Sequence, residues 1–463
     1  RVELLQTHIS LIFIAGDVVY KVKKAVDFGF LDFTTLEKRQ FYCGEELRLN
    51  RRLAPEIYLD VVEIVERPDG RLALNEPGLV VDYAVVMKKI PEERMLKKLL
   101  ASGETSISVM ERVARKVADF HRQAETGGKI DEIGGLETIR RNHEENFEQT
   151  LPFIDVTIPR YQYALLRSWA LKFLEAQEGL FRRRVANHRI RDCHGDLHLR
   201  NICLLDSQPC LFDCIEFNDQ IATIDVLYDL AFLLMDLWYR GFPELANLAA
   251  NRYVDETDND DGFALLPFLM AVRAAVRSHV TATQVEEGGD PSGSLRAEAR
   301  AYFDLATELL KERPPRLIAI GGLSGSGKTT IAEALAAHVG AAPGARIVES
   351  DRIRKTLHGV SPETRLPDKA YRPEVSERVY REMAWRANLV LAEGGSVVAD
   401  AVFDRPPDRL RIEQVATELR VPFLGIWLDV SPDVMWRRVD RRRGGPSDGD
   451  RGDRRARRPS SAT

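Results

Sequence analysis

The stretch His194–Asn201, HGDLHLRN, sets an Asp at 196 and an Asn at 201 within one short polar loop. Two apolar segments follow it, ICLL and PCLFDCIEF, and they predict a strand hairpin whose second strand ends at Asp213. Transfer of a phosphoryl group needs a carboxylate beside the attacking hydroxyl and oxygen ligands for Mg²⁺ on the phosphates. The loop and the hairpin can supply both, with His194 bracing the loop through a hydrogen bond.

The rest of the first three hundred residues predicts two kinds of structure. Residues 1–90 predict antiparallel strands around one helix, including a hairpin at Gly16. From about residue 92 to 185, apolar residues recur at the i, i+3 and i+4 positions of helices. Strands return at 189–217, and helices continue to about 312. The order predicts a small sheet with one helix, followed by a larger and mostly helical part.

These segments, together with VVYKVKK at 18–24 and CGEELRLNRRLAPEIY at 43–58, resemble the aminoglycoside phosphotransferase and choline kinase family over roughly residues 1–310. The resemblance implies an α+β, protein-kinase-like bilobal domain that uses ATP and Mg²⁺. It also implies that Asp196 is the catalytic base and that Asn201 and Asp213 are the Mg²⁺ ligands.

The same resemblance places the nucleotide contacts in the N-terminal part. Lys21 aligns with the lysine that holds the α- and β-phosphates, and Lys23 is the alternative on the same face of the strand. Glu46, or Glu45 if the register slips, aligns with the helix glutamate that pairs with this lysine. The backbone around Met87–Lys89, in YAVVMKKIP, would meet adenine.

One departure from the family concerns the first hairpin. The segment THISLIFIAGDVVYK has no G-x-G-x-x-G pattern, so an inactive nucleotide-binding relative stays open as an alternative. Asp225 and Asp229, in TIDVLYDLAFLLMDL, match the family's segment after the metal-binding Asp, and we expect them to be structural.

A second phosphate-binding pattern lies in RLIAIGGLSGSGKTTIAEAL at 316–335. The pattern G-x-x-x-x-G-K-T falls between a predicted strand and a predicted helix, which is the context that the motif requires. Its glycines let backbone N–H groups turn toward phosphate oxygens, its Lys reaches the terminal phosphates, and its Thr hydroxyl binds Mg²⁺. The predicted nucleotide-binding residues are Gly322, Ser324, Gly325, Ser326, Gly327, Lys328, Thr329 and Thr330, with Thr329 also a metal ligand.

Strands and helices alternate through 316–440, which predicts an α/β domain with a parallel sheet. With VESDRIRKTLHG and GGSVVADAVFDR, this part resembles small P-loop kinases of the gluconate, shikimate and zeta-toxin type and the predicted AAA-type kinase domains grouped with them. The resemblance implies Asp351 as the catalytic base, Arg354 as a substrate or phosphate contact, and Asp400 as a Mg²⁺ ligand through water. The alternatives are a helix cap for Asp351 and a strand-end carboxylate for Asp400.

The segment after Trp436, RRVDRRRGGPSDGD, resembles a lid whose arginines close over the transferred phosphoryl group. Arg438 and Arg442 are the candidates, and a solvated helix face is the alternative. Such kinases have a further strand and an adenine-contacting loop after the lid, whereas this sequence continues into an Arg-, Ser- and Pro-rich tail. We therefore expect only four core strands. Either the sequence is shortened or altered at this end, or this half binds nucleotide poorly.

Four parts are predicted from these patterns. The pair Pro314-Pro315 interrupts the chain before the second motif and marks the main boundary. The parts are a smaller kinase-like lobe at 1–90, a larger lobe at 91–312, a P-loop kinase domain at 313–445 and a disordered Arg-rich tail at 446–463.

Charge and composition point to no macromolecular partner. The net charge is −5, no apolar run reaches the roughly 18 residues of a membrane-spanning helix, and the first residues lack a signal-peptide pattern. We therefore expect a cytoplasmic protein that binds neither membrane nor nucleic acid. The five cysteines contain no CxxC pair, which favours reduced packing thiols over a zinc site.

The two motifs together predict a bifunctional ATP-dependent phosphotransferase, each half acting on a hydroxyl of a small molecule such as an aminosugar, an aminoglycoside or a related metabolite. Two alternatives stay open. One is a nucleotide-sensing regulator that binds ATP without transfer, and the other is a nucleic-acid end kinase that uses the P-loop half. The acidic run DETDNDD at 255–261 is expected either to attract a cationic substrate or to be a solvated loop.

Overall fold

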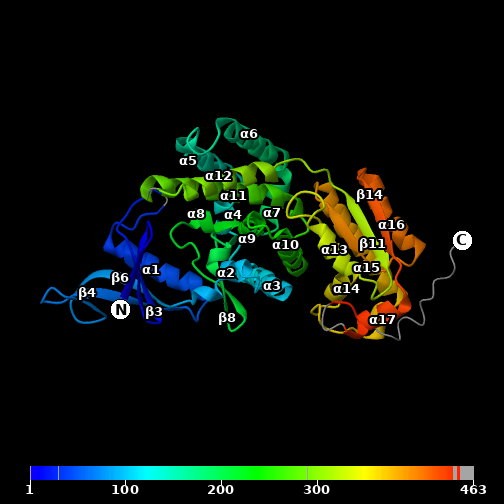
Figure 1. The fold of residues 1–463 in the computed structure, drawn as a ribbon, viewed down its shortest axis with the longest axis horizontal. Coiled ribbons are helices and arrows are strands. Elements are labelled where there is room, and N and C mark those ends of the chain that lie inside the picture. The colour runs from blue at the N-terminus through cyan, green and yellow to red at the C-terminus, as the bar shows by residue number, and fades with distance from the viewer. Residues whose placement is uncertain (1, 30, 289, 442–445, 449–463) are drawn as a thin grey trace. The chain divides into compact units, whose positions relative to one another are not determined.

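The computed structural model describes residues 2–29, 31–288, 290–441 and 446–448 (Figure 1). The chain divides into two compact units, and each combines two stretches of sequence. The first unit is Arg1–Pro152 with Leu171–Asp236, and the second is Phe153–Ala170 with Leu237–Thr463. This partition is distinct from the predicted boundaries at residues 90, 312 and 445, which stay a prediction. Most of the predicted tail, and Arg442 among the predicted lid arginines, lie outside the described residues.

A six-stranded antiparallel sheet opens the first unit, in the order β1-β2-β3-β6-β4-β5. Helix α1 (Leu36–Arg51) packs against β4 and β6 and begins at Thr35, whose hydroxyl accepts from the Lys38 N–H at 3.3 Å (Figure 1). The strands are β1 (Val2–Gln6), β2 (Ser10–Ala15), β3 (Val18–Lys23), β4 (Tyr58–Glu66), β5 (Leu72–Leu74) and β6 (Leu79–Lys88). The sheet and helix predicted for residues 1–90 are both present.

Helices and two short strand pairs form the rest of the first unit. Strands β8 (Ile202–Leu205) and β9 (Gln208–Leu211) make the hairpin predicted after the polar loop, and β7 (Ile190–Asp192) pairs antiparallel with β10 (Thr223–Asp225). The helices are η1 (Glu92–Arg94), α2 (Leu96–Ala101), α3 (Ile107–Gln123), α4 (Lys129–Ile133), α5 (Leu136–Thr150), η2 (Leu151–Phe153), α7 (Glu178–Ala186), η3 (Leu199–Asn201), α8 (Asp219–Ala222) and α9 (Val226–Tyr239). Helix α6 (Arg160–Ala176) contributes to both units.

The cysteines serve the packing of the first unit. Cys43, Cys203 and Cys210 belong to one apolar cluster with Tyr58 and Val85. All five cysteines are buried and free of disulfides. This agrees with the prediction of packing thiols.

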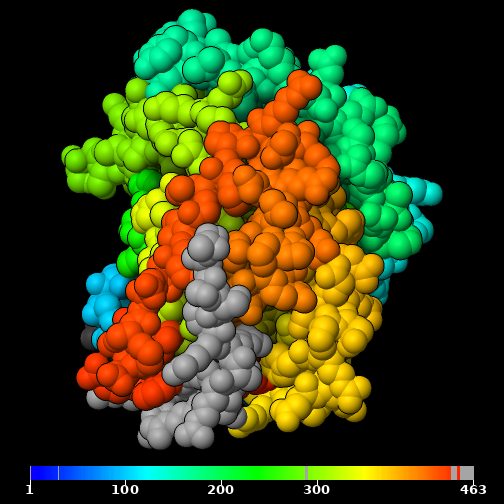
Figure 2. Space-filling model, turned by 90° about the vertical axis from the view of Figure 1, so that its right-hand side faces the viewer, coloured from blue at the N-terminus to red at the C-terminus, as the bar shows by residue number. Residues whose placement is uncertain are grey.

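The second unit holds a four-stranded parallel sheet in the order β12-β13-β11-β14. Its strands are β11 (Leu317–Gly322), β12 (Arg346–Glu349), β13 (Val397–Asp400) and β14 (Phe423–Leu428). They alternate with α13 (Lys328–Ala336), α14 (Ser350–Leu357), η5 (Asp368–Tyr371), α15 (Pro373–Ala392), α16 (Pro406–Leu419) and α17 (Pro432–Arg441). The part of the chain that the structure describes has the four strands expected here, with β14 at one edge. Figure 2 shows the face on which the orange and red residues of the last helices form the surface.

The remaining helices of the second unit precede this sheet. They are α10 (Pro243–Thr257), η4 (Phe263–Leu265), α11 (Leu266–Gly288) and α12 (Ser294–Leu309), and α11 packs along α12. The segment Phe263–Glu286 is long and apolar enough to cross a membrane by length and composition alone, which corrects the expectation that no segment reaches that length. Of its most apolar window, 72% is buried inside the protein, and a core helix passes the same test.

The acidic run 255–261 begins in the last turn of α10, and part of it belongs to a buried ion-pair network within the second unit. Asp260 is 2% exposed and accepts from Arg346 Nε at 2.7 Å and from Arg386 Nη1 at 2.9 Å. Asp255 accepts from Arg346 Nη2 at 2.7 Å, and Asn251 Oδ1 accepts from the Ile347 N–H at 2.7 Å. Asp255 and Asp260 are therefore not part of a solvated loop, and attraction of a cationic substrate by this run stays a prediction. Asp255 and Asp260 fix α10 against strand β12 of the parallel sheet.

We expect Asp260→Ala to lower the free energy of unfolding by about 3–5 kcal/mol, because it leaves two buried guanidinium groups without a shared counter-charge. Urea denaturation of the full chain measures this change. The control is Glu244→Ala, which removes an exposed carboxylate 3.3 Å from His338 Nε2 and is expected to cost about 1 kcal/mol or less. Equal losses in the two variants would contradict a structural role for the network.

Candidate functional site

The first candidate site begins with a lysine and a glutamate in the six-stranded sheet and its helix. Lys21 on β3 donates from Nζ to Glu46 Oε1 of α1 and to Asp213 Oδ1, each at 2.8 Å. The Glu46 side chain is fully buried, Lys21 is 14% exposed, and Asp213 is 46% exposed. The structure therefore brings together three of the residues predicted to handle the nucleotide and the metal.

The two register alternatives have different surroundings. Lys23 also donates to Glu46, at 2.7 Å, but its other partner is Glu216 and its side chain is 1% exposed. Lys21 is the lysine that reaches the accessible Asp213 carboxylate. Glu45 instead pairs with the exposed Arg48 at 2.7 Å, so Glu46 is the glutamate that faces the lysines.

The charges of this cluster reinforce one another. Burial alone would lower the pKa of Lys21, but the carboxylates of Asp213 and Glu46 outweigh it and hold that pKa well above its usual value. Burial would raise the pKa of Glu46, yet the two lysines lower it to about 2. Lys21 and Glu46 are therefore both charged at neutral pH, which suits a lysine that binds phosphate oxygens.

The polar loop holds Asp196 and Asn201 in direct contact. Asn201 Nδ2 donates to the backbone oxygen of Asp196 and to its Oδ2, both at 3.0 Å. The His198 ring lies with its Nε2 atom 3.4 Å from the same carboxylate oxygen. Because the amide nitrogen is used by Asp196, Oδ1 is the Asn201 atom that suits a metal ion. The Asp196 side chain is 34% exposed, so a substrate hydroxyl can reach it.

His194 joins this loop to the Asp213 segment, as expected from the sequence. Its Nε2 atom lies 2.9 Å from the backbone oxygen of Phe212, and its Nδ1 atom accepts from the Asp196 N–H at 3.3 Å. Burial lowers the pKa of His194, which favours the neutral ring with its proton on Nε2. His194 therefore holds Asp196, the predicted base, in a fixed relation to the segment that carries Asp213.

Asp229 binds the backbone of the same loop. The sequence predicted a structural role for this residue. It accepts from the backbone N–H groups of His194 at 3.1 Å and Gly195 at 2.9 Å, and it lies 3.0 Å from His121 Nε2. The sequence pattern did not identify His121, which comes from α3. Its position becomes apparent only when α3 and α9 are packed together.

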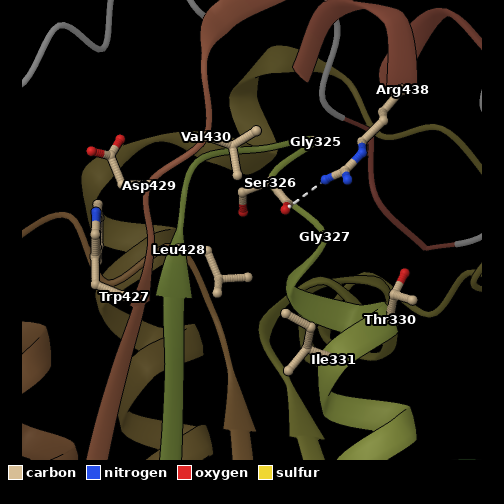
Figure 3. A pocket seen from close by; sticks show the side chains of 10 residues that line it. All are labelled: Gly325, Ser326, Gly327, Thr330, Ile331, Trp427, Leu428, Asp429, Val430 and Arg438. Atoms are coloured by element: carbon tan, nitrogen blue, oxygen red, sulfur yellow. Dashed lines mark hydrogen bonds between the residues drawn. The ribbon is translucent and has the colours of Figure 1, made fainter. Parts of the chain in front are cut away.

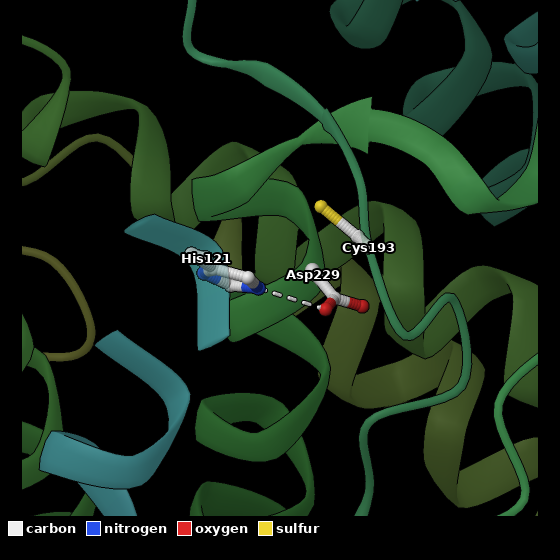
Figure 4. Close-up of side chains that lie close together, drawn as sticks. All are labelled: His121, Cys193 and Asp229. Atoms are coloured by element: carbon white, nitrogen blue, oxygen red, sulfur yellow. Dashed lines mark hydrogen bonds and ion pairs between the residues drawn. The ribbon is translucent and has the colours of Figure 1, made fainter. Parts of the chain in front are cut away.

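His121, Cys193 and Asp229 lie close enough to suggest a metal site (Figure 4). Their polar atoms already have roles, since Asp229 binds the loop and the Cys193 thiol donates to the backbone oxygen of Ile224 at 3.5 Å. Burial also raises the pKa of Cys193 well above its usual value, so the thiolate that a metal needs is disfavoured. We interpret this cluster as the support of the loop that holds Asp196 and Asn201.

Asp213 has an unusual backbone. Its φ of 64° lies in the left-handed region, which is rare for residues other than Gly, Asn and Asp. Its N–H donates to the Tyr58 hydroxyl at 3.1 Å, and the next N–H, of Cys214, donates to Asn50 Oδ1 at 2.9 Å. Tyr58 and Asn50 were not predicted as site residues. They hold the strained turn that aims Asp213 at Lys21.

Met87 lies inside β6, where it is opposite Val19 of β3 and Tyr58 of β4. The following N–H groups are used by the fold, because Lys88 donates to Ile57 O and Lys89 donates to Asp17 O, both at 2.8 Å. The adenine contact of this segment stays a prediction.

The second candidate site is the loop between β11 and α13. Gly322, Gly325 and Gly327 have φ values of 145°, 85° and 100°, which favour glycine. The hydroxyls of Ser324 and Ser326 are buried without a hydrogen-bond partner among the described residues. These unsatisfied donors and the turned backbone fit a phosphate chain, and Lys328 Nζ lies at the loop, 3.2 Å from Leu323 O.

The predicted metal pair is also in contact. Thr329 Oγ1 donates to Asp400 Oδ2 at 2.6 Å, where β13 ends. Burial raises the pKa of Asp400 to about 6, against the opposing effects of Lys328 and Thr329. Glu349 ends the neighbouring strand β12 opposite Asp400, and burial raises its pKa to about 8. Glu349 was not predicted as a site residue, because its place beside Asp400 depends on the order of the strands.

A pocket of about 820 Å³ opens over this loop (Figure 3). Arg438 of α17 points into it and donates from Nη1 to the Ser326 backbone oxygen at 2.9 Å. A Cβ on Gly327 would lie 3.2 Å from that guanidinium. The lining residues are Gly325, Ser326, Gly327, Thr330, Ile331, Trp427, Leu428, Asp429, Val430 and Arg438. Trp427 and Asp429, on and just after β14, are pocket residues that the motif alone did not indicate.

Asp351 and Arg354 both lie on α14 but have different surroundings. The Asp351 charge contributes to raising the pKa of Asp400, which places it electrostatically beside the metal pair. Arg354 is 7% exposed, donates to Ala370 O at 2.7 Å, and lies 4.7 Å from the centre of the Tyr371 ring. Arg354 thus holds η5 in this structure, and its substrate contact stays a prediction.

Comparisons with known proteins match two separate ranges of the chain to two protein families. Residues 40–266 match the model of a phosphotransferase enzyme family, and residues 317–458 match the model of an AAA domain. Uncharacterized proteins of Mycobacterium bovis and Mycobacterium tuberculosis are 29% identical over 451 residues, which is 96% of this chain and 87% of each relative. An adenylyl-sulfate kinase of Myxococcus xanthus is 29% identical over 114 residues, 25% of this chain and 57% of that protein.

Two solved structures are similar to part of this chain. A choline/ethanolamine kinase family protein from Mesorhizobium loti has a TM-score of 0.39 and 14% identity, covering 67% of this chain and 88% of that one. Choline kinase from Cryptosporidium parvum has a TM-score of 0.42 and 12% identity, covering 67% and 89%. The two family models agree with the resemblances stated from the sequence, and the antiparallel and parallel sheets of the structure confirm the predicted fold class. Residues 40–266 are therefore similar to the phosphotransferase enzyme family, and residues 317–458 are similar to an AAA domain.

Proposed function

We propose that this protein carries two ATP-dependent phosphotransferase sites, each of which transfers the γ-phosphoryl group to a hydroxyl of a small molecule. The observation that carries the proposal is the pairing of complete residue sets in both halves. Lys21, Glu46 and Asp213 are joined at 2.8 Å beside the Asp196 loop, and Thr329 meets Asp400 at 2.6 Å beside the glycine-rich loop.

In the first half, each residue has a separate task. Asp196 accepts the proton of the acceptor hydroxyl, because its carboxylate is partly exposed and held by Asn201. Lys21 binds phosphate oxygens, and Glu46 keeps it charged and oriented. Asn201 and Asp213 would hold Mg²⁺, which neutralises charge on the β- and γ-phosphates when bound.

In the second half, the loop backbone and Lys328 bind the phosphates, and Thr329 with Asp400 would hold Mg²⁺. Arg438 lies at the pocket and can stabilise the charge of the transferred group. Asp351 accepts the proton of the acceptor. We propose a hydroxyl-bearing metabolite as the acceptor class, such as an aminosugar or a sugar acid.

Equilibrium dialysis of the full chain with ATP tests whether both halves bind nucleotide. We expect two ATP molecules per chain in the presence of Mg²⁺, and weaker binding after chelation with EDTA because the phosphate charge is then less neutralised. A stoichiometry of one would remove one half from the proposal. No binding at either site would overturn it.

A further inference from the structure

The segment 446–448 places the carboxylate of Asp448 in an anion-binding site of the P-loop half. We call this site, formed by Lys355, Leu366 and Tyr371, the receptor. Asp448 accepts from Lys355 Nζ at 2.7 Å with each of its two oxygens. Oδ2 also accepts from the Leu366 backbone N–H at 2.9 Å and from the Tyr371 hydroxyl at 2.6 Å. A cation, a backbone donor and a phenol therefore converge on one oxyanion.

The receptor is buried and braced by neighbouring residues. Lys355 is 1% exposed on its side chain, so a counter-charge is required there whenever the lysine is ionised. Lys355 also donates to Thr364 O, and the Arg354 guanidinium lies 4.7 Å from the centre of the Tyr371 ring. These contacts fix the donors independently of what they bind.

The receptor lies beside the predicted base of the second half. Lys355 is four residues after Asp351 on α14, so the two side chains share one face of the helix. The pKa of Tyr371 is raised by burial, by its bond to Asp448 and also by the charge of Asp351, and the Asp351 charge acts on Asp400 as well. The Asp351 charge therefore acts both on Asp400, beside Thr329, and on Tyr371 of the oxyanion receptor.

We propose that Lys355, Tyr371 and the Leu366 N–H form the acceptor-anion site of the P-loop half, which Asp448 fills when no acceptor is bound. The acceptor is then a hydroxyl compound that carries a carboxylate, a sulfate or a phosphate group. The anionic group binds the three donors, and its hydroxyl is directed toward Asp351. This inference rests on the proposed function for its meaning in catalysis, but the site itself can be tested without nucleotide.

Binding of simple anions to full-length variants provides the test. All variants carry Lys328→Ala, so that sulfate and phosphate do not bind the glycine-rich loop. Isothermal titration with acetate, sulfate and inorganic phosphate then measures the receptor, and the anion that binds best shows which acceptor group it fits. A tethered carboxylate competes at millimolar effective concentration, so we expect Asp448→Ala to tighten binding of at least one anion by about tenfold or more.

Lys355→Met added to Asp448→Ala is expected to abolish this binding. Asp448→Asn keeps the size of the side chain and, like Asp448→Ala, is expected to tighten anion binding. It replaces the Ala variant if that variant fails to fold. Asp433→Ala, at an exposed carboxylate of α17, is the control and should change nothing. No saturable binding to the folded Asp448 variants, or binding that survives Lys355→Met, would overturn the proposal. Because no ATP is present, either result leaves the proposed function to be decided separately by phosphoryl transfer.

Discussion

Asp196→Asn is expected to lower the rate of phosphoryl transfer by the first half about 10²- to 10⁴-fold, the range that general-base catalysis contributes. The Asn side chain keeps the shape that Asn201 binds at 3.0 Å but no longer accepts a proton from the acceptor hydroxyl. ATP binding should be nearly unchanged, because Lys21 and Asp213 are not altered. Single-turnover transfer from ATP to an acceptor measures the rate, and dialysis measures nucleotide binding.

The matched control for this variant is Asp219→Asn, at an exposed position that begins helix α8. It should retain the rate of the unchanged protein. If Asp196→Asn transferred phosphoryl at the normal rate, Asp196 would not be the base, and the polar loop would have a structural role only.

Lys328→Ala is expected to weaken ATP binding at the second site by about 10- to 100-fold, since a hydrogen bond from a charged donor contributes roughly 1.5–3 kcal/mol. Transfer by this half should become undetectable, because the lysine also neutralises the terminal phosphates. The first site should keep its ATP, so dialysis should show one tightly bound nucleotide per chain instead of two.

Lys311→Ala is the control for Lys328→Ala, because Lys311 is 63% exposed and forms a local ion pair with Glu308. Loss of both nucleotides in Lys328→Ala would show that the two halves do not bind ATP independently. Retention of both would contradict the assignment of the glycine-rich loop.

The elements that carry the two motifs could be predicted from residues that are close together in the sequence. The glycines of the second loop need positive φ whatever surrounds them, and the spacing of Asp196 and Asn201 fits a single turn. For the same reason the antiparallel sheet with α1 and the four parallel strands could be predicted from periodicity. These features depend on residues that are close together in the chain.

The choice between Lys21 and Lys23 could not be made from the sequence. Both lie on one face of β3 and both reach Glu46, so strand periodicity treats them alike. What separates them is that Lys21 meets Asp213 and Lys23 meets Glu216, and these partners are 192 and 193 positions away. Such a difference is set by tertiary packing.

The burial of Asp260 in the acidic run could not be predicted from the sequence for a related reason. A row of carboxylates favours solvent on average, and only the approach of Arg346 and Arg386 makes burial of Asp260 favourable. Tyr58, Asn50 and His121 were missed likewise, because each supports the first site across long sequence separations.

Transfer of label from γ-labelled ATP to an organic acceptor tests directly whether both halves are phosphotransferases. The full chain is incubated with Mg²⁺, γ-labelled ATP and a panel of aminosugars, aminoglycosides, sugar acids and amino alcohols, alongside Asp196→Asn and Lys328→Ala. We expect labelled organic products, one of which is lost in Asp196→Asn alone and another in Lys328→Ala alone. Label that reaches only water, or stays in ATP that is bound, would contradict a phosphotransferase and favour a nucleotide-sensing regulator.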